Sequence, residues 1–202
     1  MNEQRIQWID SARGIGILLV VIGHVSKSPY LGKFIYSFHM PLFFIISGYL
    51  YNNKKYAQKA YIKRKAENIL VPYFIFGICS LVYWILIERN IRNQTEKLPI
   101  WQFVNMFLCF GGDENYIYNA PLWFLPALLN TEIICSFLFK LKEKNIKIIA
   151  FIISIIGVIF SKCIAIRLPF CIDIVMVTIP FYVFGYYLKQ KDAIKLFRLK
   201  EK

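Results

Sequence analysis

The chain has 202 residues, of which 57% are hydrophobic and 17% aromatic, and its formal net charge is +13. Soluble domains of this length are rarely so apolar, and several long runs of this sequence contain almost no charge. These properties exclude an ordinary soluble domain and indicate a polytopic membrane protein.

Six apolar runs are long enough to be membrane spans, because a hydrocarbon core about 30 Å thick takes roughly 20 helical residues to cross. The spans are expected near residues 10–27, 34–51, 69–87, 121–139, 146–161 and 170–188. Lipid offers the backbone no hydrogen-bond partners, and the runs lack the alternating polarity of barrel strands. The predicted fold class is therefore all-α, a transmembrane helical bundle with about six spans. A shorter run at 100–110 is predicted to be interfacial or re-entrant.

The positive charge is concentrated in segments that fall on one side of the membrane if six spans alternate. Most of the 25 Lys and Arg residues lie near the N-terminus or in segments 54–68, 140–147 and 189–202. The positive-inside rule then predicts a cytoplasmic N-terminus, a membrane domain over 1–188 and a basic cytoplasmic tail over 189–202. The same rule accounts for the charge without a nucleic-acid partner, since no nucleic-acid recognition motif accompanies it.

The first span, in "DSARGIGILLVVIGHVSKS", keeps ionisable residues, which are costly in a membrane and are functional candidates for that reason. Arg13 and His24 are eleven residues apart, so they lie on one helix face, separated by roughly 16 Å along the axis. Asp10 lies one turn before Arg13, within reach of an ion pair. The alternative is that Arg13 only anchors the helix at the cytoplasmic surface and that His24 caps its outer end.

The short turn after the first span predicts that the first two spans form an antiparallel hairpin. His24 and His39, the two histidines of the chain, then return to a similar depth in the outer half of the membrane. In "SFHMPLFFIISGYLY", Pro41 is expected to kink the second helix and to free backbone carbonyls, with Ser47 and Gly48 one to two turns later. This pattern indicates the wall of a site, although a single intramembrane histidine can also be a packing residue.

Three segments together carry a family resemblance. The sequence "RIQWIDSARGIGILLVVIGH", followed by "FIYSFHMPLFFIISGYLY" and later by "PLWFLPALL", resembles the acyltransferase-3 family of integral membrane acyltransferases, in particular its fucose 4-O-acetylase-like branch. The resemblance implies an O-acyltransferase that moves an acyl group, usually acetyl from acetyl-CoA at the cytoplasmic side, to a hydroxyl of a cell-surface carbohydrate or its lipid-linked precursor. It also implies a multi-pass protein among the lipids of a bacterial plasma membrane, with no metal.

The resemblance assigns roles to several residues. The family's essential histidine maps onto His24 and its basic partner onto Arg13, while His39 corresponds to the family's second-span histidine. A sugar hydroxyl needs a base that removes its proton as it attacks the thioester, and a neutral imidazole can do this, so His24 is the expected base. An acetylated histidine intermediate is left open. Trp123, in the third segment, is expected to pack or to line the substrate site.

Basic residues are the expected donor site, because coenzyme A carries phosphates. Arg13 can bind these phosphates by forked hydrogen bonds, or it can pair with Asp10. A predicted cytoplasmic cluster can also attract the anionic cofactor, or it can be a solvated positive-inside loop. This cluster consists of Lys63, Arg64 and Lys65.

Two features leave other functions open. Where the family commonly has two arginines before the proline that opens the third span, this chain has Lys65 and Asn68, and family members usually have about ten spans. A catalytically inactive truncated remnant or a regulatory membrane subunit is therefore an alternative. A small transporter with an intramembrane His and Asp relay is a third. Glu132 and Asp173 lie inside predicted spans and serve either function or helix-to-helix hydrogen bonding.

Overall fold

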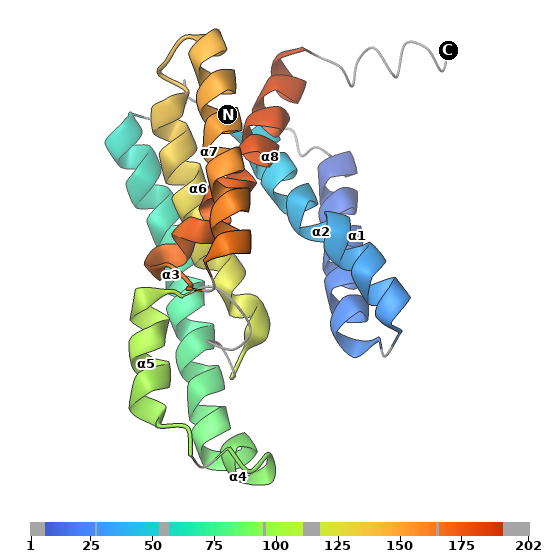
Figure 1. Cartoon of the computed structure of the whole chain (residues 1–202), viewed down its shortest axis with the longest axis vertical. Coiled ribbons are helices and arrows are strands. Elements are labelled where there is room, and N and C mark those ends of the chain that lie inside the picture. Colours follow the sequence, from blue (N-terminus) through green and yellow to red (C-terminus); the bar gives the residue numbers. More distant parts are fainter. Residues whose placement is uncertain are drawn as a thin grey trace. The chain divides into compact units, whose positions relative to one another are not determined.

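The computed structural model describes residues 7–26, 28–52, 57–94, 96–110, 118–164 and 166–191 (Figure 1). Within these ranges all regular structure is helical. The longer helices are α1 (Gln7–Val25), α2 (Pro29–Leu50), α3 (Gln58–Tyr83), α5 (Pro99–Leu108), α6 (Phe124–Leu138), α7 (Glu143–Cys163) and α8 (Ile172–Gln190). Shorter helical turns extend or precede them: η1 (Trp84–Glu88), α4 (Arg89–Ile91), η2 (Ala120–Trp123) and η3 (Pro169–Cys171).

Six helical segments among the described residues are long and apolar enough to cross a bilayer. They are Gln7–Val25, Pro29–Leu50, Gln58–Ile91, Pro121–Leu138, Glu143–Cys163 and Pro169–Gln190. This result confirms the predicted all-α bundle of about six spans, and all segments but the third agree with the predicted spans to within a few residues. The cytoplasmic N-terminus and the domain limits stay predictions, and the predicted basic tail beyond Lys191 lies outside the described residues.

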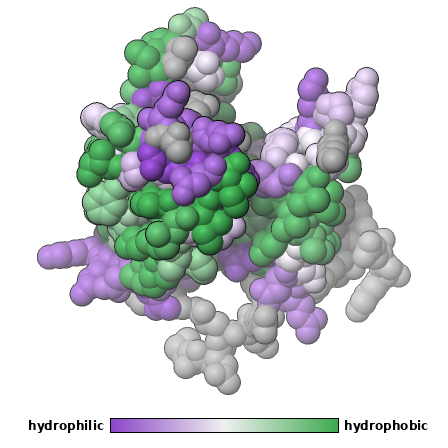
Figure 2. Space-filling model, turned by 90° about the horizontal axis from the view of Figure 1, so that it is seen from below, coloured by the Kyte–Doolittle hydropathy of each residue, from purple (hydrophilic) through white to green (hydrophobic). Residues whose placement is uncertain are grey.

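Large apolar side chains cover the outward faces of these helices. On α1 and α7, for example, Leu18 and Phe151 are 63% and 66% exposed. Figure 2 shows this surface as broad hydrophobic areas between hydrophilic residues. Monomeric soluble proteins rarely expose contiguous apolar patches of this kind, so these faces fit contact with lipid.

Helix α3 begins at Gln58, well before the predicted start of the third span at residue 69. Lys, Arg, Glu and Ala are good helix formers, and they extend the helix beyond the apolar run that marked the span. The helix continues through η1 and α4 to Ile91, so its basic and apolar portions form one element. Lys63 and Lys65 therefore lie on a helix, which corrects the expectation of a solvated loop.

Helix α5, in the predicted interfacial or re-entrant run, packs beside α3 (Figure 1). Pro99 occupies its first turn, and Cys109 ends it in the left-handed conformation with φ 51°. The Tyr73 hydroxyl of α3 donates to the Met106 carbonyl at 2.6 Å, and the Met106 sulfur fills the space beside Gly77. Its interfacial or re-entrant position stays a prediction, and the structure shows that it is anchored to a span.

The chain forms two compact units, and each is described by itself. The first unit comprises residues 1–51 and 180–202, so it contains α1, α2 and the second half of α8. Helices α1 and α2 form the predicted hairpin. Ser28 caps α2 by accepting a hydrogen bond from the Leu31 amide at 3.4 Å, and Pro29 takes the first helical position.

Helix α2 packs on α1 with one row of side chains. Ile35, His39 and Phe43 follow one another at four-residue spacing, so they share a helix face. Ile35 lies against Gly23 of α1, and Phe43 lies against Gly16. The two glycines have no Cβ atoms, so the row can approach closely. His39 therefore lies on the face of α2 that packs on α1.

Helix α2 meets the second half of α8 at two further glycines. A Cβ atom on Gly48 would collide with the Tyr182 carbonyl, and one on Gly185 would collide with the Ile45 carbonyl. The backbones of the two helices are consequently in direct contact at this crossing. Small residues are what permits such an approach between membrane helices.

The second unit, residues 52–179, is built on α3 and α6, which run antiparallel. Three contacts set their register: Asn119 Nδ2 to Ser80 Oγ at 3.0 Å, Lys65 Nζ to Glu132 Oε1 at 2.8 Å, and Gln58 Nε2 to Ser136 Oγ at 3.3 Å. The buried hydroxyls of Thr131 and Thr178 join α6 to the first half of α8 at 2.8 Å. On the other side of α8, Met176 lies against Gly157 of α7.

Gly48→Ala and Gly185→Ala are each expected to lower the free energy of unfolding by about 1–3 kcal/mol, because the added methyl group must push two backbones apart. Gly14→Ala is the matched control, since its Cβ would meet no described atom within 4 Å. That change should be neutral or stabilise the helix by up to about 1 kcal/mol. Denaturant titration in detergent micelles compares the three variants, and equal stability of Gly14→Ala and Gly48→Ala would contradict the close crossing.

Candidate functional site

The two histidines lie around one tyrosine of the α1–α2 hairpin. The ring centroids of His24 and Tyr36 are 5.9 Å apart, and those of Tyr36 and His39 are 5.3 Å apart. The His24 Nδ1 atom is also 3.5 Å from the Tyr36 hydroxyl. His24 lies in the last turn of α1 and is exposed, whereas His39 is completely buried. The hairpin thus brings both predicted histidines into contact with the same phenol ring.

The tautomer of His39 follows from its partner. His39 Nδ1 is 2.7 Å from the Ile35 carbonyl oxygen, one turn earlier in α2. A carbonyl only accepts hydrogen bonds, so Nδ1 must be the protonated nitrogen, and in the neutral ring Nε2 carries the lone pair. Among the residues that the structure describes, no group hydrogen-bonds the buried Nε2 atom. His39 therefore presents a buried acceptor whose hydrogen-bonding capacity is unused.

The other predicted site residues of the first unit, on the donor or the substrate side, lie on α1 and α2. Arg13 is exposed in the second turn of α1, and Asp10 is half-buried in the first turn. Because α1 is one unbroken helix, Arg13 and His24 are separated by roughly 16 Å along its axis. Ser47 is half-buried on α2, beside the glycine at which α8 crosses.

The structure separates the three basic residues predicted to attract the cofactor. Lys63 and Arg64 are exposed on α3, and Lys63 forms a 3.8 Å ion pair with Glu67. Lys65 is directed to α6 instead, where its ammonium group donates to Glu132 at 2.8 Å. The carboxylate side chain is 1% exposed and the lysine side chain 35%. Lys65 thus neutralises a buried acid, and a phosphate would have to compete with that acid for the ammonium group.

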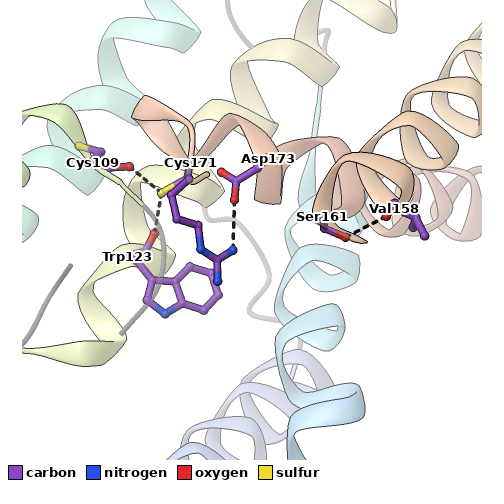
Figure 3. Close-up of polar contacts among 7 residues, drawn as sticks. Cys109, Trp123, Val158, Ser161, Cys171 and Asp173 are labelled. Carbon is purple, nitrogen blue, oxygen red and sulfur yellow. Dashed lines mark hydrogen bonds and ion pairs between the residues drawn. The ribbon is translucent and has the colours of Figure 1, made fainter. Parts of the chain in front are cut away.

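Trp123 lies at a junction of three segments in the second unit (Figure 3). Its carbonyl oxygen is 3.6 Å from the Cys171 thiol, which also donates to the Cys109 carbonyl at 3.0 Å. Close by, Arg167 Nη1 binds the Asp173 carboxylate at 3.2 Å, and this carboxylate is 5% exposed. Asp173 therefore pairs with a basic residue of the preceding loop. The indole ring of Trp123 is half-buried and packs edge-on against Phe124.

Two features of the site escaped sequence reasoning. Tyr36 was not singled out, although it lies three residues before His39 and so shares a face with it. The pairing of Lys65 with Glu132 depends on the register between α3 and α6, and no local pattern in the sequence encodes that register. The three-residue spacing between Tyr36 and His39 is the feature of the sequence that could have identified Tyr36.

These features define a multi-pass membrane protein with a histidine pair on its first helical hairpin. A sequence model of the acyltransferase-3 family, described as an acyltransferase domain, matches residues 6–200. The chain therefore belongs to the acyltransferase-3 family.

Two relatives are similar to most of the chain. Nodulation protein NolL of Mesorhizobium japonicum is 30% identical over 197 residues, which cover 90% of this chain and 47% of that protein. Nodulation protein NolL of Sinorhizobium fredii is 27% identical over 204 residues, covering 90% and 48%. The chain thus spans about half the length of these curated relatives. No solved structure matches the chain significantly.

The ion pair between Lys65 and Glu132 gives a stability prediction. Lys65→Met removes the ammonium group that donates to the buried Glu132 carboxylate, so we expect it to lower the free energy of unfolding by about 1.5–3 kcal/mol, the range for a hydrogen bond to a charged group. Adding Glu132→Gln should restore part of this loss, because the buried charge that Lys65 helped to balance is then gone. The measurement is a double-mutant cycle by denaturant titration in detergent.

Lys63→Met is the matched control for this cycle, since its ion pair with Glu67 is exposed and is worth no more than about 1 kcal/mol. A loss with Lys65→Met as small as that with Lys63→Met would show that the ion pair does not hold α3 to α6. If the Lys65→Met and Glu132→Gln double variant is less stable than Lys65→Met alone, packing of the two aliphatic side-chain stems, rather than charge, would explain the loss.

Proposed function

We propose that the chain carries the catalytic base of a membrane-bound O-acyltransferase. In this proposal an acetyl group moves from acetyl-CoA to a hydroxyl of a cell-surface carbohydrate or its lipid-linked precursor, at the plasma membrane of a bacterium. The observation that carries the proposal is the acyltransferase match over residues 6–200, which includes His24 and the partner that the hairpin gives it. The chemistry of the pair supports it further.

His24 is suited to act as the base when Tyr36 fixes its ring. If the Tyr36 oxygen accepts the Nδ1 proton, Nε2 is the bare nitrogen that can take the proton of an acceptor hydroxyl. As that proton leaves, the hydroxyl oxygen forms a bond with the thioester carbon. The carbon–sulfur bond then breaks, and the proton passes from the imidazolium to the departing thiolate, which leaves as coenzyme A.

Arg13 is the proposed binding residue for the phosphates of the donor. It is exposed on α1, and its guanidinium group can donate paired hydrogen bonds to phosphate oxygens. Lys63 and Arg64, which are exposed on α3, would add a long-range attraction for the anionic donor. Lys65 would contribute less, because its ammonium group already binds Glu132.

Binding of acetyl-CoA to the purified protein in detergent tests these roles. Arg13→Ala should weaken acetyl-CoA binding about tenfold, the effect of losing roughly 1.4 kcal/mol of charge-assisted hydrogen bonding. His24→Ala should leave binding within about threefold of wild type, while transfer of labelled acetyl groups in membranes falls by about 10²-fold or more. Lys33→Ala, which removes an exposed cation near the turn of the hairpin, is the control for net charge.

The outcomes separate the candidate functions. Full transfer activity in His24→Ala would overturn its assignment as the base. Equal weakening by Arg13→Ala and Lys33→Ala would reduce the role of Arg13 to general electrostatic attraction. Absence of acetyl-CoA binding in every variant, wild type included, would support the catalytically inactive alternative.

A further inference from the structure

The buried Nε2 atom of His39 is a hydrogen-bond acceptor that the described fold does not use. Leaving such an atom buried and unpaired lowers the stability of the fold, because the atom has lost its hydrogen bonds to water without replacement. The row of α2 that packs on α1 is otherwise apolar at Ile35 and Phe43, and a hydrophobic side chain at residue 39 would fill the space without this cost. A histidine here is explained if a ligand supplies the missing donor.

The partner of His39 in the described fold is a neutral group. Its Nδ1 atom donates to the neutral carbonyl of Ile35, so this partner supplies no negative charge to stabilise an imidazolium. In hydrolytic triads a carboxylate at the equivalent position provides that charge. His39 is consequently suited to accept a hydrogen bond from a group that keeps its proton, such as a hydroxyl.

Tyr36 links this acceptor to the proposed base. Its ring is in contact with both imidazoles, at centroid distances of 5.3 Å to His39 and 5.9 Å to His24. A ligand with several hydroxyl groups could engage the two rings through different hydroxyls. Carbohydrates carry several hydroxyls around one ring, which gives the pair of histidines a matching class of ligand.

We propose that His39 Nε2 accepts a hydrogen bond from one hydroxyl of the acceptor sugar and so positions a second hydroxyl at His24. This inference rests on the proposed function, because it presumes that His24 acts on a hydroxyl. In the proposed complex the hydroxyl at His39 keeps its proton, and no covalent bond forms or breaks there. His39 is thus an acceptor-binding residue, and its tautomer is set by Ile35.

The chain has two histidines, so the proposal can be tested directly on the protein labelled with ¹⁵N-histidine. The probe is octyl fucoside, and octyloxytetrahydropyran, which has the same chain and ring without hydroxyls, is its control. In liposomes without probe, the His39 spectrum should show a protonated Nδ1 and a bare Nε2. Octyl fucoside should shift the Nε2 resonance toward its hydrogen-bonded value, and the hydroxyl-free control should not. A spectrum of His24→Ala assigns the remaining ring.

Two substitutions separate the acceptor atom from the rest of the ring. In His39→Asn the amide nitrogen can replace Nδ1 at the Ile35 carbonyl, but the acceptor at Nε2 is lost. In His39→Gln the amide oxygen can replace Nε2, but the donor at Nδ1 is lost. With labelled acetyl-CoA as donor, His39→Asn should raise the KM for octyl fucoside about tenfold and change kcat much less. His39→Gln should keep this KM within about threefold of wild type.

The results separate failure of this inference from failure of the proposed function. A protonated Nε2, or a bare Nε2 that saturating octyl fucoside leaves unchanged, would overturn the role of His39. An equal rise of KM in His39→Asn and His39→Gln would also overturn it, since packing alone would then explain the residue. If Nε2 responds to octyl fucoside but wild type transfers no acetyl group, the hydroxyl site stands and the transferase proposal fails.

Discussion

The backbone contact of α2 and α8 at Gly48 and Gly185 is the constraint on which the first unit depends. Lipid is as apolar as the helices that it surrounds, so close packing rather than the hydrophobic effect must hold helices together in a membrane. The two glycines permit that packing. Around them, the Tyr51 ring contacts Tyr182 and Tyr186 of α8, and Lys189 Nζ donates to the Tyr51 carbonyl at 3.1 Å. Residues that lie far apart in the sequence thereby hold α2 from one face, while α1 packs on the face that carries His39.

In the second unit an ion pair joins two helices, whereas in the first unit close contact between helix backbones does so. The ion pair between Lys65 and the buried Glu132 carboxylate joins α3 to α6 in one register. The family resemblance leads one to expect arginine near this position. An arginine could hold an internal acid and a phosphate through different edges of its guanidinium group, whereas a lysine ammonium is a single point charge. Lysine at residue 65 therefore favours the structural bond over donor binding, and it leaves Lys63 and Arg64 as the exposed members of the predicted basic cluster.

The sequence was sufficient to predict the six spans and the histidine hairpin, because both depend on local composition. Apolar runs identify helices in lipid, and a short turn between two of them brings His24 and His39 together whatever the rest of the chain does. The features that were not predicted are contacts between distant parts of the sequence and the position at which a helix begins. The early start of α3 was hidden because its charged residues are good helix formers with low hydropathy. The Lys65 bond to Glu132 and the tautomer of His39 depend on which atoms meet, and composition carries no information about that.

The unbroken course of α1 from Gln7 to Val25 gives the proposed reaction its geometry. A continuous helix keeps Arg13 and His24 on one face at a fixed separation of roughly 16 Å, which is comparable with the reach of an extended pantetheine arm. A donor held at Arg13 by its phosphates could thus present its thioester at His24 without any movement of the helix. The acceptor-binding atom proposed on His39 lies at the His24 end, next to the same tyrosine ring. In the proposed reaction, donor and acceptor would then approach from opposite ends of α1 and meet at His24.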